Sequence, residues 1–161
     1  MTALLGLLQE FYREKLTSFL RHQAAARFIA QYDVNNTYQY IINRDDTHLS
    51  WLAAATSELG GTVLELSEPS RDPGAKGEAG ANRLIEEDAT DADAFVNRWK
   101  PRVAAMTNAR HARMLGVILG EVLEQKRFFE QALAGRTDLL GRRSDVLGPS
   151  QGEVLPARWI E

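Results

Sequence analysis

Four stretches of this chain repeat apolar residues every three or four positions, the spacing that lines one face of an α-helix. They span residues 3–31, 35–58, 90–106 and 108–134, and no stretch reads as a convincing β-strand. Each such helix has an apolar stripe to bury, and 161 residues is a usual size for one domain. The pattern therefore predicts an all-α fold, a single antiparallel four-helix bundle.

A long connection separates the second and third stretches. Residues 62–80 are rich in Pro, Gly and Ser and lack helical spacing, while Gly60 and Gly61 mark the end of the helix before them. A link of this length usually crosses over the body of a domain. We therefore expect two helical hairpins joined by a crossover, with the bundle in residues 1–135 and an extended C-terminal tail, residues 136–161, packed on it.

Capping residues predict the start of the third helix. Thr90 and Asp93 resemble a capping pair, so the helix is expected to begin at Thr90, after a short helical piece at 81–87. Pro101 lies inside this stretch and should kink the helix or displace its start. The acidic run Glu86-Glu87-Asp88 is expected to be solvated near this start, where acidic side chains suit the helix dipole.

Composition excludes several classes of function. A net charge of −3 and a pI near 5.7 give no electrostatic footprint for nucleic acid. The chain has no Cys, which excludes disulfides and thiolate-bound metals. The apolar run at the start ends after eight residues, at Gln9-Glu10, and is too short for a signal peptide or a membrane span. We therefore expect a cytoplasmic protein with neither nucleic acid nor membrane as a partner.

Asp45 and His48 are polar residues on the apolar stripe of the second helix. They lie three positions apart, in register with apolar residues such as Ile41 and Leu52, and so share one face of the helix. Burial of an unpaired charge is costly, so both side chains must have a hydrogen-bond partner, an opposite charge or a metal ion beside them. One interpretation is that both side chains bind a metal ion. The other is a hydrogen-bonded pair held by a Tyr or by an Arg from another helix.

The run from Asp45 to Leu52 (DDTHLSWL), closing on Glu58-Leu59-Gly60-Gly61, resembles the second helix of ferritin-like and rubrerythrin-like proteins. In that superfamily an acidic-x-x-His step is followed by apolar residues and a Leu-Gly-Gly end. The order of two helices, a long link and two more helices is also similar to these proteins. The resemblance implies a carboxylate-bridged pair of iron or manganese ions with oxidoreductase-type chemistry on oxygen, peroxide or iron.

The resemblance also implies ligands on the other helices. On the fourth helix Glu121 and Glu124 stand where a second acidic-x-x-His step belongs, with Glu124 in place of His. A solvated face, with both carboxylates paired to nearby Lys or Arg, is the alternative for them. On the first helix Glu10 and Glu14 are available, although the residue level with Asp45 lies near 21, which favours His22. The candidate metal ligands are Glu14, Asp45, His48, Glu121 and Glu124.

The third helix offers a carboxylate only at its start, Asp91 or Asp93, so one expected ligand is missing. A site for zinc or nickel on His22, His48 and His111 is a further possibility, as in DinB-like bundles. That family usually places two histidines four apart, a pair this chain lacks. Two functions remain open: a metal-binding oxidoreductase, or a metal-free ferritin-like module for structure or protein interaction. Self-association as a homodimer is expected in either case.

Overall fold

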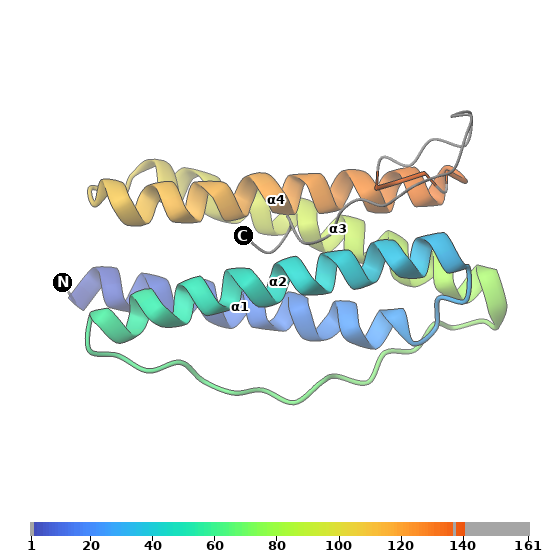
Figure 1. Ribbon diagram of the computed structural model, residues 1–161, viewed down its shortest axis with the longest axis horizontal. Helices are drawn as coiled ribbons and strands as arrows, with labels where there is room; N and C mark the ends of the chain where they lie inside the picture. Colours follow the sequence, from blue (N-terminus) through green and yellow to red (C-terminus); the bar gives the residue numbers. More distant parts are fainter. Residues whose placement is uncertain (1, 137, 141–161) are drawn as a thin grey trace, which may run out of the picture.

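The computed structural model describes residues 2–136 and 138–140, which fold into four α-helices and no strand. The helices are α1 (Thr2–Ala26), α2 (Tyr32–Glu58), α3 (Gly77–Ala104) and α4 (Ala109–Leu133). They lie side by side along one long axis, and the link after α2 runs the length of the bundle (Figure 1). The prediction of an all-α, four-helix protein is confirmed.

The helices pack as two pairs. Most contacts between helices are those of α1 with α2 and of α3 with α4, while α1 meets α3, and α2 meets α4, along narrower seams. The apolar stripes of all four helices close on one core. Its largest fully buried side chains include those of Phe11, Tyr38, Leu84, Trp99 and Phe129.

Local signals in the sequence explain where most of the helices begin and end. The side chain of Gln31 accepts a hydrogen bond from Val34 N at 2.7 Å and starts α2, and Asn108 does the same for His111 N at 3.0 Å in α4. Gly60 has a φ of 83°, which a residue with a side chain rarely adopts, so α2 ends just before it.

The third helix begins earlier than predicted. It is continuous from Gly77, so the expected start at Thr90 and the separate piece at 81–87 are wrong. Alanine, leucine and isoleucine between these positions continue the buried stripe, which makes a break at Thr90 unnecessary. Pro101 is accommodated within the last turn of the helix and does not displace its start.

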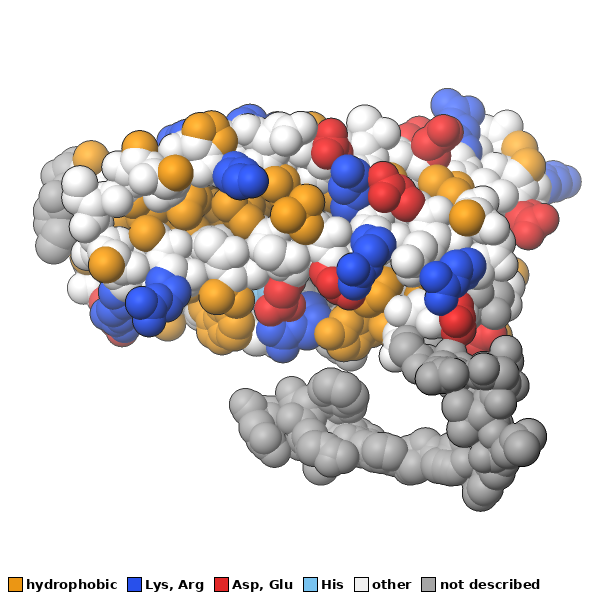
Figure 2. Space-filling view, turned by 90° about the horizontal axis from the view of Figure 1, so that it is seen from above, with side chains coloured by type: hydrophobic (Ala, Val, Ile, Leu, Met, Phe, Trp, Pro, Cys, Tyr) orange, Lys and Arg blue, Asp and Glu red, His pale blue; other side chains and the backbone are white. Residues whose placement is uncertain are grey.

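The surface carries charges of both signs. On the face that Figure 2 shows, basic and acidic side chains stand next to one another, with hydrophobic side chains gathered in a patch between them. Within the described residues, no helix combines the length and the apolar character that crossing a membrane requires. Most of the predicted tail, residues 141–161, lies outside the described residues; of the part before it, Leu139 is buried.

Candidate functional site

Three helices converge on the carboxylate of Asp45, which is completely buried. Its Oδ1 accepts hydrogen bonds from Lys15 Nζ at 2.5 Å and from Gln125 Nε2 at 2.9 Å, and its Oδ2 lies 2.6 Å from His22 Nδ1. Lys15 and His22 come from α1, Asp45 from α2 and Gln125 from α4. We call these four residues the Asp45 cluster.

The charge of Asp45 is balanced inside the cluster. Burial by itself would raise the pKa of Asp45, but the neighbouring Lys15 ammonium and His22 hold that pKa well below its usual range. The carboxylate is therefore ionised at neutral pH. Lys15 is itself 1% exposed, so the two residues form a buried ion pair with the amide of Gln125 as an added donor.

His48 lies one turn further along α2 and contacts α4. Its Nε2 is 3.0 Å from Glu121 Oε1, yet neither ring nitrogen makes a hydrogen bond with a described residue. Glu121 is instead bound in bidentate fashion by Arg44, from Nε at 2.8 Å and Nη2 at 2.7 Å. The ring of Trp51 packs 5.5 Å from that of His48 on the outer side.

The environment of His48 favours its neutral form. Burial and the positive charge of Lys15 lower the pKa of His48 from 6.5 to about 4, against the opposing effects of Glu121 and Asp45. At neutral pH a neutral imidazole therefore lies between two ion pairs, Lys15–Asp45 and Arg44–Glu121.

We expect the free energy of unfolding to fall by about 3 kcal/mol as the pH decreases from 6.5 to 4, which corresponds to the shift in the pKa of His48. Below pH 6.5 the unfolded chain takes up a proton at His48, whereas the folded chain takes it up only near pH 4, so a fall in pH favours the unfolded chain. Urea unfolding at several pH values measures the effect, and His48→Gln should flatten the profile. Parallel profiles for the two proteins would contradict the assignment.

The five predicted metal ligands fall into two groups. Asp45, His48 and Glu121 lie together in the middle of the bundle, but the carboxylates among them already bind Lys15 and Arg44. The other two lie elsewhere. Glu14 Oε1 accepts from Trp99 Nε1 at 2.8 Å and from Arg98, and Glu124 pairs with Arg127.

These residues do not fit a carboxylate-bridged metal pair. In the part of the chain that the structure describes, no three His, Asp or Glu side chains are grouped so as to hold a metal ion. The position beside the central carboxylate belongs to the Lys15 ammonium, 2.5 Å from Asp45 Oδ1. Metal binding by Glu14, Asp45, His48, Glu121 and Glu124 stays a prediction that this geometry does not favour.

The three histidines have different partners. His22 binds Asp45, which confirms the expectation that it lies level with that residue. His111 Nδ1 lies 2.9 Å from Asn108 Oδ1 at the start of α4, and His48 lies beside Glu121. The three imidazoles therefore have different neighbours, Asp45, Glu121 and Asn108, which does not favour a shared zinc or nickel site.

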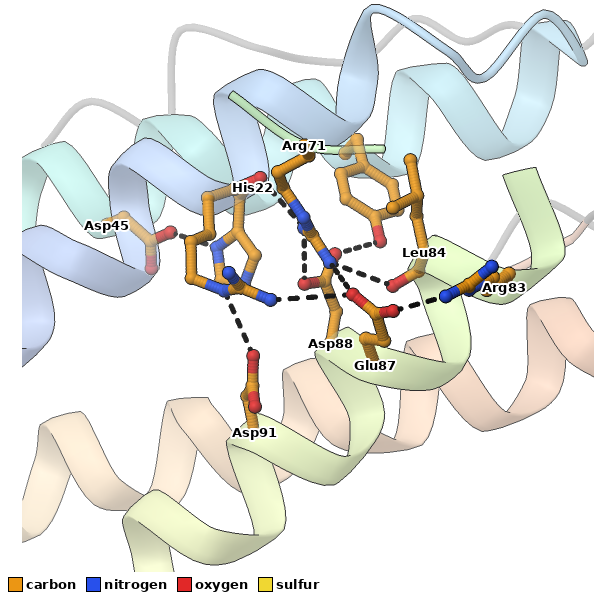
Figure 3. A network of polar contacts seen from close by, with 10 residues as sticks. His22, Asp45, Arg71, Arg83, Leu84, Glu87, Asp88 and Asp91 are labelled. Carbon is orange, nitrogen blue, oxygen red and sulfur yellow. Dashed lines mark hydrogen bonds and ion pairs between the residues drawn. The ribbon is translucent and has the colours of Figure 1, made fainter. Parts of the chain in front are cut away.

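A second buried cluster fastens the long link to the bundle. The guanidinium of Arg71 binds Asp88 Oδ1 at 2.8 Å and Glu87 Oε1 at 3.0 Å, both on α3 (Figure 3). Tyr38 donates to Asp88 Oδ2 at 2.5 Å; burial and the Asp88 carboxylate raise the pKa of Tyr38 well above its usual value, so it remains a donor. We call Tyr38, Arg71, Glu87 and Asp88 the Arg71 cluster.

The Arg71 cluster corrects one prediction. Asp88 is 1% exposed, although the acidic run that contains it was expected to be solvated. The run lies within α3 rather than at the start of a helix, and helical spacing places Asp88 on the buried stripe with Leu84 and Ile85. Its burial is possible because Arg71 supplies the opposite charge.

Sequence reasoning also missed Lys15. The residue follows Phe11 by four positions on the apolar stripe of the first helix, so its spacing marked it as a polar residue in a core position. A search restricted to carboxylates and histidines passes over such a lysine. Comparison with known proteins adds no relative: no protein-family model, curated protein or solved structure matches this chain.

Proposed function

We propose that this chain is a metal-free ferritin-like module, an antiparallel bundle of two hairpins that serves as a structural or protein-interaction unit. One observation carries the proposal. The ammonium of Lys15 lies 2.5 Å from the fully buried Asp45, where a ferritin-like site would need a metal cation.

The charges in the middle of the bundle support this function. Asp45 and Glu121 supply two negative charges, and Lys15 and Arg44 supply two positive ones, so the charges of these four side chains cancel without a metal ion. A divalent cation would have to displace at least one of these cations from a carboxylate, at the cost of a buried ion pair. The residues thus act as a scaffold rather than as a site for redox chemistry.

One observation favours the competing function, a metal-binding oxidoreductase. Both ring nitrogens of His48 are buried without a hydrogen-bond partner among the described residues, and Nε2 faces the carboxylate of Glu121. An imidazole beside a carboxylate is a common pair of metal ligands. The metal content of the protein therefore decides between the two functions.

We expect protein purified without chelators to contain no stoichiometric iron, manganese or zinc, and its Tm to be unchanged by a chelator. Lys15→Glu replaces the ammonium with a carboxylate beside Asp45, so this variant should gain a rise in Tm on addition of Mn²⁺ or Zn²⁺. Lys15→Gln, which removes the positive charge without adding a carboxylate, is the matched control and should not respond. Elemental analysis and thermal unfolding give the readouts.

Two results would overturn the proposal. One or two equivalents of metal in the wild type, lost in His48→Ala, would establish the oxidoreductase-type function instead. A Lys15→Glu variant indifferent to metal would show that Lys15 does not occupy a potential cation site. The expected homodimer is checked separately, by light scattering at several concentrations.

A further inference from the structure

A small hollow lies inside the bundle, lined by α1, α3 and α4. Its volume is about 10 Å³, close to the smallest space that holds a water molecule. The residues that line it include Lys15, Ser18 and His22 of α1, Ala92 of α3 and Gln125 of α4. We call this space the Lys15 hollow. Three of the four residues of the Asp45 cluster border it, so it adjoins the buried charges in the middle of the bundle.

The ammonium of Lys15 has donors to spare on this side. It carries three N–H groups, and its side chain is 1% exposed. Among the described residues only Asp45 accepts from it, through Oδ1 at 2.5 Å. Buried polar groups nearly always have a partner, either in the protein or in ordered water. A further acceptor is therefore expected beside Lys15, and the hollow is the space that this residue lines.

His22 offers the opposite kind of group. Its Nδ1 lies 2.6 Å from Asp45 Oδ2, and because an ionised carboxylate can only accept, Nδ1 carries the proton and donates to it. In the neutral ring Nε2 is then an acceptor, and it has no hydrogen-bond partner in the part of the chain that the structure describes. Lys15 and His22 bind the same carboxylate and line the same hollow, so a molecule in the hollow can meet both.

Size and charge restrict what this molecule can be. The volume admits a single small molecule and nothing larger than water. The ammonium of Lys15 and the guanidinium of Arg21, which also lines the hollow, disfavour a cation. The carboxylates of Asp88 and Asp91, on the α3 side, disfavour an anion such as chloride. A neutral molecule that both accepts and donates hydrogen bonds fits these conditions.

We propose that one long-lived water molecule binds in the Lys15 hollow, accepts a hydrogen bond from Lys15 Nζ and donates one to His22 Nε2. The water completes the hydrogen bonding of the buried ammonium and becomes a fifth member of the Asp45 cluster. It also brings α3, which supplies no residue to that cluster, into the wall of a shared site. The inference does not rest on the proposed function, because the metal content of the protein is measured separately.

Water-¹⁷O magnetic relaxation dispersion tests the proposal, because it counts long-lived internal water molecules and is insensitive to labile protons. The wild type should contain one more such water than Ala92→Val, in which the added methyl groups fill the hollow. Ala94→Val is the matched control: it makes the same change at an exposed position of α3 and should keep the wild-type number. Equal numbers in the wild type and Ala92→Val, or the same loss in Ala94→Val, would overturn the proposal.

A crystal structure of the wild type gives a second measurement that needs no variant. Electron density for one water should lie within about 3.2 Å of both Lys15 Nζ and His22 Nε2, the usual limit for a hydrogen bond. This result decides the question even if Ala92→Val does not fold. Density for a water that contacts neither atom, or well-ordered side chains with no density between them, would contradict the assignment.

Discussion

Replacement of Lys15 by Met is expected to lower the free energy of unfolding by about 3–5 kcal/mol, the usual cost of leaving one partner of a buried ion pair alone. Met matches the length of the lysine stem, so little packing is lost. The Asp45 carboxylate keeps His22 and Gln125 as neighbours but loses its nearest cation. Urea unfolding at pH 7 measures the difference.

A double-mutant cycle separates charge from packing. Asp45→Asn alone should also be strongly destabilising, because it leaves the Lys15 ammonium buried without a carboxylate. Lys15→Met combined with Asp45→Asn should recover most of the loss, since neither charge then remains. Arg110→Met is the surface control: its ion pair with Glu58 is exposed, so the expected change is below about 1 kcal/mol. A similarly small cost for Lys15→Met would show that the buried pair contributes no more than a surface pair.

The sequence predicted the fold better than the site because helix formation depends on spacing, which can be read locally. The apolar steps placed four helices, and Gly60 marked the end of α2 within two residues. The start of α3 failed for a specific reason. Thr90 carried a capping signal, but buried residues such as Leu84 continued the stripe before it, and packing overrode the local signal.

The site could be predicted only for residues on one face of a single helix, or for residues whose heights on two consecutive helices can be counted from the turn that joins them. Asp45 and His48 share a face, and the level of His22 followed from the turn between α1 and α2. The partners of Asp45 depend on how α1 and α4 are rotated about their axes, which the sequence does not specify. Arg71 has a long side chain of a kind that often reaches solvent, and it lies on a link without helical spacing, so the sequence gives little reason to bury it.

Arg71→Met should produce the second large effect, a loss of about 3–5 kcal/mol in the free energy of unfolding. The Asp88 carboxylate would keep only the hydroxyl of Tyr38 from the Arg71 cluster, and its charge would be buried without a cation. The carbonyl oxygen of Arg21, inside α1, would also lose the additional hydrogen bond that it accepts from Arg71 Nη1 at 3.0 Å. Arg71→Lys should lose part of this stability, because an ammonium cannot reproduce the fork of the guanidinium.

The same variant should free the long link. Within residues 59–76, all of which the structure describes, Arg71 is the only buried residue, so the link has one deep attachment to the bundle. Limited proteolysis after Glu65, an exposed residue of the link, should be faster in Arg71→Met than in the wild type. Arg27→Met is the matched control, because Arg27 also binds the link, through Glu68, but at the surface. Equal cleavage rates in the two variants would mean that the link is held equally by its surface contacts. Faster cleavage in Arg71→Met alone would show that one buried guanidinium fixes the crossover between the two helix pairs.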